Sequence, residues 1–151
     1  MTLFEAPEYD ASREKRKKII AIALLVLLLV AGVLAWEFRH WRSEHKVNQF
    51  FEAIERNDMK TAYGIWNNDP TWESHPQKYK NFSLAQFELS WGPASEWGTI
   101  RSHKILAALT TKEGSGVILA VQINDRTENA FIIYNKKDGT IDFSPVEIRF
   151  Q

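Results

Sequence analysis

The stretch Val47–Trp66, VNQFFEAIERNDMKTAYGIW, carries the pattern from which the rest of the fold can be worked out. Apolar residues recur in it at intervals of three and four, at Val47, Phe50, Phe51 and Ile54. This interval predicts an amphipathic helix from about residue 37 to residue 57. Asn57 or Asp58 is a suitable N-cap for a second helix, which the breaker Asn-Asn-Asp-Pro at 67–70 would end. The stretch therefore predicts a helical hairpin.

A third helix is predicted after an intervening loop. Ser83 and Gln86 have the spacing of a capping box, in which each side chain bonds the backbone of the other residue. Phe87 and Trp91 follow on one helical face, and Gly92-Pro93 stops the helix.

The last third of the chain changes to the pattern of β-strands. Runs rich in β-formers cover residues 99–111, 117–123, 129–134 and 140–150, and turn residues separate them. Asp138-Gly139 is the strongest turn signal, and Pro145 should bend or end the last strand. Helices followed by strands predict an α+β domain of three helices and a four-stranded antiparallel curved sheet, with the helices on one face.

Alternation along the second strand predicts the two faces of this sheet. Val117, Leu119, Val121 and Ile123 should face the helices, with Phe131 and Ile133 as neighbours. Ile118, Ala120 and Ile132 would make the opposite face apolar as well. A second apolar face suggests a packed partner or a curled sheet.

Residues 43–151 resemble the nuclear transport factor 2-like superfamily, whose α+β domains are cone-shaped. The resemblance is carried by Val47–Trp66, in which an acidic-Asn-Asp link leads to Thr61-Ala62-Tyr63-Gly64-Ile65-Trp66, and by the helices and strands that follow. It implies a conical cavity. The superfamily includes dehydratases, isomerases, cargo adaptors and membrane-complex subunits, so the fold alone does not select an activity.

Ile19–Trp36, IIAIALLVLLLVAGVLAW, contains eighteen residues without a charge. As a helix it would be roughly 27 Å long, enough to cross the apolar layer of a bilayer. We predict a cytoplasmic tail (1–18), a transmembrane helix (19–36), a juxtamembrane helical linker (37–46) and an extracytoplasmic domain (47–151). The alternative is a cleaved secretory signal, for which Val33-Leu34-Ala35 would be a suitable cleavage site.

The flanking charges predict the orientation of the span. Arg13 and the basic residues 15–18 precede it, whereas the basic residues after it are sparser and are interleaved with Glu37 and Glu44. The positive-inside rule then places the N-terminus in the cytoplasm and the domain outside. The arrangement resembles that of small bacterial membrane proteins, which implies a bacterial inner membrane, and that of the bitopic inner-membrane component of type IV secretion systems. The latter resemblance implies an envelope-assembly role as one alternative.

Composition excludes several classes of function. The 19 basic and 19 acidic residues balance, which argues against nucleic-acid binding. The chain has no cysteine, so disulfides, thiolate metal sites and thiol nucleophiles are excluded.

The residues proposed to bind a ligand are aromatic, with one histidine. An apolar pocket in the conical cavity would be lined by Tyr63, Trp66, Trp72, Phe87, Trp91, Trp97 and His103. Packing in the core is the alternative role for the same rings. We therefore expect a non-enzymatic binding or accessory protein without a cofactor, which takes a protein partner, another copy of itself or a small apolar ligand.

An acid–base enzyme of the dehydratase or isomerase type is the alternative function. Its base would be His103 or His75, with Asp69 or Glu96 as the carboxylate partner. Glu37, His40 and Glu44 share a helical spacing that suits half of a metal site, but a second such helix is lacking, and we predict no metal.

Overall fold

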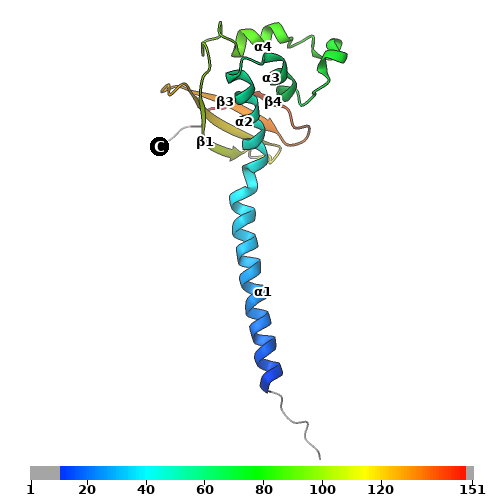
Figure 1. The fold of residues 1–151 in the computed structure, drawn as a ribbon, viewed down its shortest axis with the longest axis vertical. Coiled ribbons are helices and arrows are strands. Elements are labelled where there is room, and N and C mark those ends of the chain that lie inside the picture. The colour runs from blue at the N-terminus through cyan, green and yellow to red at the C-terminus, as the bar shows by residue number, and fades with distance from the viewer. Residues whose placement is uncertain (1–10, 149–151) are drawn as a thin grey trace, which may run out of the picture. The chain divides into compact units, whose positions relative to one another are not determined.

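The structure is a computed structural model that describes residues 11–148 of the chain. The residues group into two units, Met1–Arg39 and His40–Gln151. The elements are labelled in Figure 1 and run in the order α1 (Ala11–Glu37), α2 (Trp41–Glu55), α3 (Met59–Trp66), α4 (Leu84–Trp91), β1 (His103–Thr110), β2 (Gly116–Ile123), β3 (Asn129–Asn135) and β4 (Ile141–Phe143), with short 3₁₀ turns at Phe38–His40, Trp72–Ser74 and Pro76–Tyr79.

The first unit contains α1, whose apolar side chains are exposed along the predicted span. The helix is long and apolar enough to cross a membrane, as a membrane anchor or as a signal sequence. At its C-terminal end the Arg39 guanidinium lies 4.0 Å from the centre of the Trp36 ring. Tryptophan and arginine are residues that favour the interface between lipid and water.

In the second unit, α2 and α3 are joined by a three-residue link, residues 56–58. Asn57 adopts a left-handed φ of 58°, and the amides of Asn57 and Asp58 bond the carbonyls of Ile54 and Ala53. This is a Schellman motif, which satisfies the last carbonyls of α2. Asp58 then caps α3, because its carboxylate accepts a hydrogen bond from the amide of Thr61.

A second Schellman motif ends α3. Asn68 has a φ of 50°, and the amides of Asn68 and Asp69 bond the carbonyls of Ile65 and Gly64. The Asn68 side chain also donates to the carbonyl of Asp138 over 2.7 Å. The end of α3 is thereby tied to the turn between β3 and β4.

The predicted start and end of the third helix are confirmed. Ser83 caps α4, and the capping box with Gln86 is complete. The helix ends at Trp91, immediately before Gly92-Pro93. Phe87 and Trp91 are both buried.

The four strands form one antiparallel sheet in the order β1-β2-β3-β4. β1 begins at His103, four residues later than the predicted run. The prediction for the last strand was too long, since β4 covers only Ile141–Phe143. Pro145 follows it and cannot donate to a neighbouring strand, which explains the early end. Residues 149–150 of that predicted run lie outside the described residues.

The side chains of β3 lie on the opposite faces of the sheet from those predicted. Leu119 pairs with Ile132 and Ile118 pairs with Ile133, so Ile132 lies on the face toward the helices. Phe131 and Ile133 lie with Ile118 and Ala120 on the opposite face. The prediction assigned these two faces of β3 the wrong way round because all its central residues are apolar, and only the pairing register reveals which of them faces the core.

The core lies between the helices and one face of the sheet. All four residues of the predicted stripe on α2 are buried. Phe50 contacts the rings of Trp66, Phe87 and Trp91 at centroid distances of 5.3, 6.0 and 5.4 Å. Each large apolar side chain buried in this way contributes about 1.5–3 kcal/mol to folding. The helices are therefore joined through one aromatic cluster.

Replacing Gly139 by alanine should destabilise the domain more than replacing Gly114. Both glycines have a left-handed φ, 73° and 71°, which costs an alanine about 1–2 kcal/mol. A β-carbon at residue 139 would also lie 2.8 Å from the Asn68 amide nitrogen, whereas at residue 114 nothing lies within 4 Å. Urea unfolding of the full chain in detergent measures both variants, and equal losses of stability would show that the Asn68 contact contributes nothing.

Candidate functional site

Four of the aromatic residues proposed to bind a ligand belong to the core. Tyr63, Trp66, Phe87 and Trp91 are between 0 and 3% exposed and pack against one another. The Tyr63 hydroxyl donates to the carbonyl of Phe82. The structure thus brings these rings together as a packed cluster, and Trp66 and Trp91 each also border a small surface cavity.

The other two proposed aromatics lie nearer the surface and apart from each other. Trp72 packs edge-on against Tyr63 at 4.8 Å, and its indole N–H donates to the carbonyl of Lys60. Trp97 lies beside Arg126, whose guanidinium is 5.9 Å from the ring centre. Both contacts are ordinary ways of holding a partly buried tryptophan.

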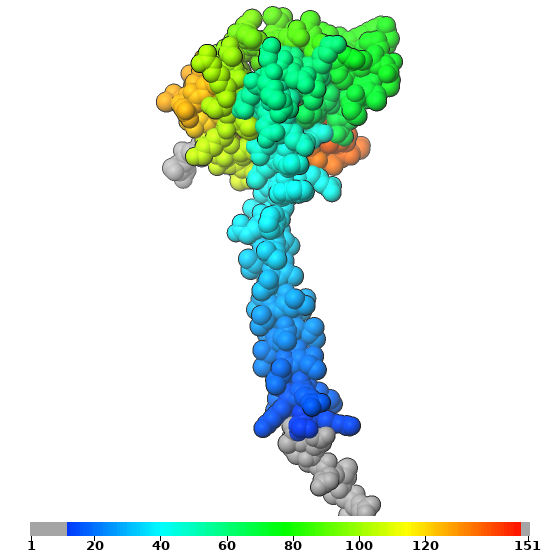
Figure 2. All heavy atoms as spheres, viewed as in Figure 1, coloured from blue at the N-terminus to red at the C-terminus, as the bar shows by residue number. Residues whose placement is uncertain are grey.

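His103 is the proposed residue with the most specific surroundings. Its Nδ1 lies 2.7 Å from Glu55 Oε1, its Nε2 lies 3.0 Å from Asn48 Oδ1, and its ring stacks on Phe51 at 5.1 Å. The three partners come from α2, and His103 is the first residue of β1. In Figure 2 the atoms of α2 (cyan to teal) lie beside the segment that enters the sheet (yellow-green).

The carboxylate partner of His103 is Glu55, which was not among the candidate carboxylates, Asp69 and Glu96, taken from the sequence. Glu55 and His103 are 48 positions apart, so no local spacing could pair them. Both ring nitrogens are occupied whichever way the Asn48 amide is turned. The arrangement ties β1 to α2.

Asp69 and His75, the other proposed acid–base residues, do meet. His75 Nε2 lies 3.4 Å from Asp69 Oδ2, which also accepts a hydrogen bond of 2.5 Å from the Tyr79 hydroxyl. The other oxygen accepts from the amide and hydroxyl of Thr71. The Tyr79 hydrogen bond, with those from Thr71, lowers the pKa of Asp69 to about 2. Asp69 therefore acts as the anchor of the loop that follows α3.

Within residues 12–148, no group of three or more His, Cys, Asp or Glu side chains is placed to hold a metal ion. Glu37 belongs to the first unit and His40 and Glu44 to the second, and the 3₁₀ turn Phe38–His40 lies between α1 and α2 in the sequence.

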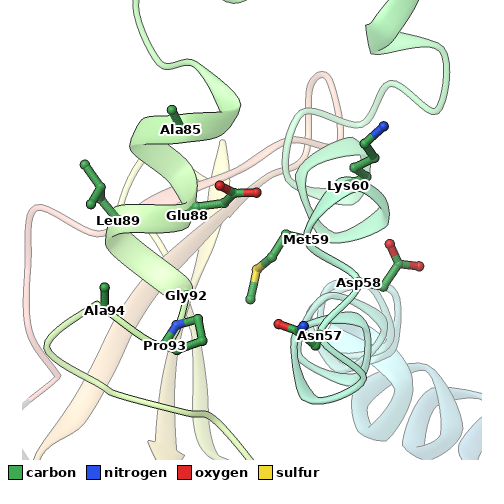
Figure 3. Close-up of a pocket in the computed structure, with 10 residues that line it drawn as sticks. All are labelled: Asn57, Asp58, Met59, Lys60, Ala85, Glu88, Leu89, Gly92, Pro93 and Ala94. Carbon is green, nitrogen blue, oxygen red and sulfur yellow. The ribbon is translucent and has the colours of Figure 1, made fainter.

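A cavity of the helical layer lies between the start of α3 and α4, and we call it the helical groove. Its volume is about 790 Å³, and its lining includes Met59, Glu88, Leu89 and Pro93. Figure 3 shows Met59 and Glu88 both pointing into the space between the two helices, whereas Leu89 projects from the other side of α4. Leu89 is 68% exposed.

A smaller cavity, the inner recess, adjoins the helical groove. It has a volume of about 220 Å³ and shares Asn57, Met59 and Pro93 with the groove. Glu55 and Trp91 also line it. The Trp91 indole N–H is buried and has no hydrogen-bond acceptor in the described part of the chain.

A third cavity lies on the outer face of the sheet. Its volume is about 710 Å³, and Leu109, Ile118 and Ile133 form its floor. The segment after β4 forms a wall that includes Val146, which is 58% exposed. This is the second apolar face that the sequence predicted, formed by a different set of residues from β3.

Sequence reasoning missed Met59, Glu88 and Leu89. Leu89 follows Phe87 by two positions, which places it off the buried face of α4. An apolar residue outside the buried stripe was the available signal. Met59, which also lines the groove, is separated from it by thirty positions and could be identified only from the packing of the two helices.

The bond between His103 and Glu55 should show energetic coupling. We expect Glu55→Ala and His103→Ala each to destabilise the domain, and the double variant to lose less than the sum, with a coupling energy of about 0.5–3 kcal/mol. Urea unfolding of the four proteins measures it. Glu52→Ala, at an exposed position of the same helix, is the control. Additive losses for the pair would contradict the assigned contact.

The hydrogen bonds accepted by the Asp69 carboxylate should persist at mildly acidic pH. Its pKa in the folded chain is about 2, below the ordinary value of 3.8, so the carboxylate stabilises the loop fully above pH 3.8 and loses this effect as the pH falls toward 2. The amide of Thr71 donates to this carboxylate, and its NMR chemical shift should titrate with a midpoint near 2. Asp69→Asn should abolish the transition. A midpoint at 3.8 or above would contradict the assignment.

Comparison of the chain with protein-family models, with curated proteins and with solved structures gave no match.

Proposed function

We propose that this chain is a single-span membrane protein whose second unit binds a partner through the helical groove. Residues 1–18 lie in the cytoplasm, α1 crosses the membrane, and His40–Gln151 lies outside the cytoplasm. The partner is a protein, and the chain serves as an accessory subunit of a membrane complex.

The membrane part of the proposal is supported by α1 and its flanks. The helix is apolar over the length of a bilayer, and its apolar side chains are exposed. The basic residues 13–18 precede the apolar run, which favours a cytoplasmic N-terminus. A signal peptide would have a shorter apolar region and a shorter leader, so we favour an uncleaved anchor.

The exposure of Leu89 in the helical groove is the observation that carries the binding function. The interior is filled by packed aromatic rings, so the ligand site that we expected in a central cavity is assigned to the surface instead. Leu89 and Met59 provide apolar contact area there, and the adjoining inner recess adds depth. Exposed apolar surface rimmed by polar side chains is typical of a protein-binding site.

The resemblance to the nuclear transport factor 2-like superfamily is part of this proposal. The order of three helices followed by four antiparallel strands supports it. The curved sheet and the cone shape are features that the resemblance implies. A binding role without chemistry agrees with the occupied ring nitrogens of His103.

Purification from native membranes in mild detergent tests the function. We expect an intact mass of 17.5 kDa and one stoichiometric membrane partner. Leu89→Asp should abolish co-purification, because a charge in the groove removes the apolar contact. Leu89→Ala should leave stability within about 0.5 kcal/mol of the wild type, since the side chain is exposed.

Val146→Asp is the matched control, because Val146 is also exposed but lines the cavity on the outer face of the sheet. Retention of the partner by this variant, together with its loss from Leu89→Asp, supports the helical groove. If the partner is lost from Val146→Asp but retained by Leu89→Asp, the binding site lies on the outer face of the sheet. A mass that begins near Trp36 would show that α1 is a cleaved signal.

A further inference from the structure

We infer that the helical groove and the inner recess select a basic amphipathic peptide segment of the partner protein. This inference rests on the proposed function and names the chemistry of the partner. It follows from two features of the two cavities: their charge and their apolar lining.

The charged side chains of the two cavities are mainly acidic. Asp58 and Glu88 line the groove, and Glu55 lines the recess. Lys60 is the one basic residue among the described lining residues, and its ammonium group is paired with Glu73 at 2.9 Å. A ligand in the groove therefore meets negative charge that the chain itself leaves uncompensated.

Glu88 is the carboxylate best placed to meet a cation. Asp58 is engaged in capping α3, and Glu55 is shared with His103. The Glu88 carboxylate has no hydrogen bond or ion pair within residues 12–148, and Figure 3 shows it directed across the groove toward Met59. A lysine or arginine at this position would form a charge-assisted hydrogen bond next to an apolar surface.

The apolar lining favours a ligand with an apolar face in addition to its charge. Leu89, Met59 and Pro93 belong to this lining. An amphipathic helix laid into a groove presents apolar and charged residues three or four positions apart, which matches an apolar lining with a carboxylate beside it. Methionine adapts its shape to such partners because its side chain is flexible.

Methionine-methyl NMR of the full chain provides a direct test. The chain contains only two methionines, Met1 in the N-terminal tail and Met59 in the groove. Labelled with ¹³C at the methyl carbons in a non-ionic detergent micelle, it gives one signal that reports the groove and one internal reference. The probes are three amphipathic peptides of equal length and equal leucine pattern, whose polar positions are lysine, glutamine or glutamate.

We expect the leucine–lysine peptide to shift the Met59 signal saturably while the Met1 signal stays in place. The leucine–glutamine peptide should bind about tenfold more weakly, since it lacks the charge-assisted contact, and the glutamate peptide more weakly still. Added salt should reduce this difference. Equal affinity of the lysine and glutamine peptides would overturn the inference about charge while leaving the groove as a binding site.

Two variants test whether Glu88 is the residue that favours the lysine peptide. Glu88→Gln should weaken binding of the lysine peptide about tenfold and leave the glutamine peptide unchanged. Glu113→Gln, in the exposed turn between β1 and β2, is the matched control and should change neither affinity. An unchanged Met59 shift in either variant before peptide is added shows that the fold is intact.

Two further outcomes would overturn the inference. If no peptide moves the Met59 signal, both the peptide specificity and the groove itself fail. If dodecyltrimethylammonium, a cation on a hydrocarbon chain, moves Met59 at least as strongly as the lysine peptide does, the site takes a small amphipathic cation and not a peptide.

Discussion

The second unit depends on the contacts of Phe50, because this one ring joins all three helices that cover the sheet. It projects from α2 and meets Trp66 of α3 together with Phe87 and Trp91 of α4. Trp91 in turn stacks on Phe143 of β4 at 5.7 Å. Helices of eight residues are unstable alone, so α3 and α4 exist because this cluster buries one side of each.

The proposed binding surface of the second unit lies outside its filled core. Aromatic rings occupy the space between the helices and the sheet, so this interior contributes to stability. The helical groove lies where α3 and α4 turn their remaining residues, including Met59 and Leu89, toward solvent. The same short helices thus provide the core on one side and the proposed contact surface on the other.

The polar contacts within this unit connect elements that are distant in the sequence. His103 ties β1 to α2 through Glu55 and Asn48, and Asn68 ties the end of α3 to the turn at Asp138. Asp69 holds the loop after α3. The contacts of His103 are partly buried, where an unpaired polar group would be costly. These contacts hold helices and sheet in one arrangement.

The sequence by itself determined the elements that depend on local physics. The apolar run of α1, the stripe on α2, the caps at Asp58 and Ser83 and the turn at Gly139 follow from hydrophobic periodicity, hydrogen bonding and backbone sterics within a few residues. The tertiary structure alone decided the strand register, which exchanged the faces of Ile132 and Ile133, and the pairing of His103 with Glu55. It also decided that Met59 of α3 and Glu88 of α4 point into the same groove. These relations join residues far apart in the chain, and their energies depend on how the elements pack, which no local pattern encodes.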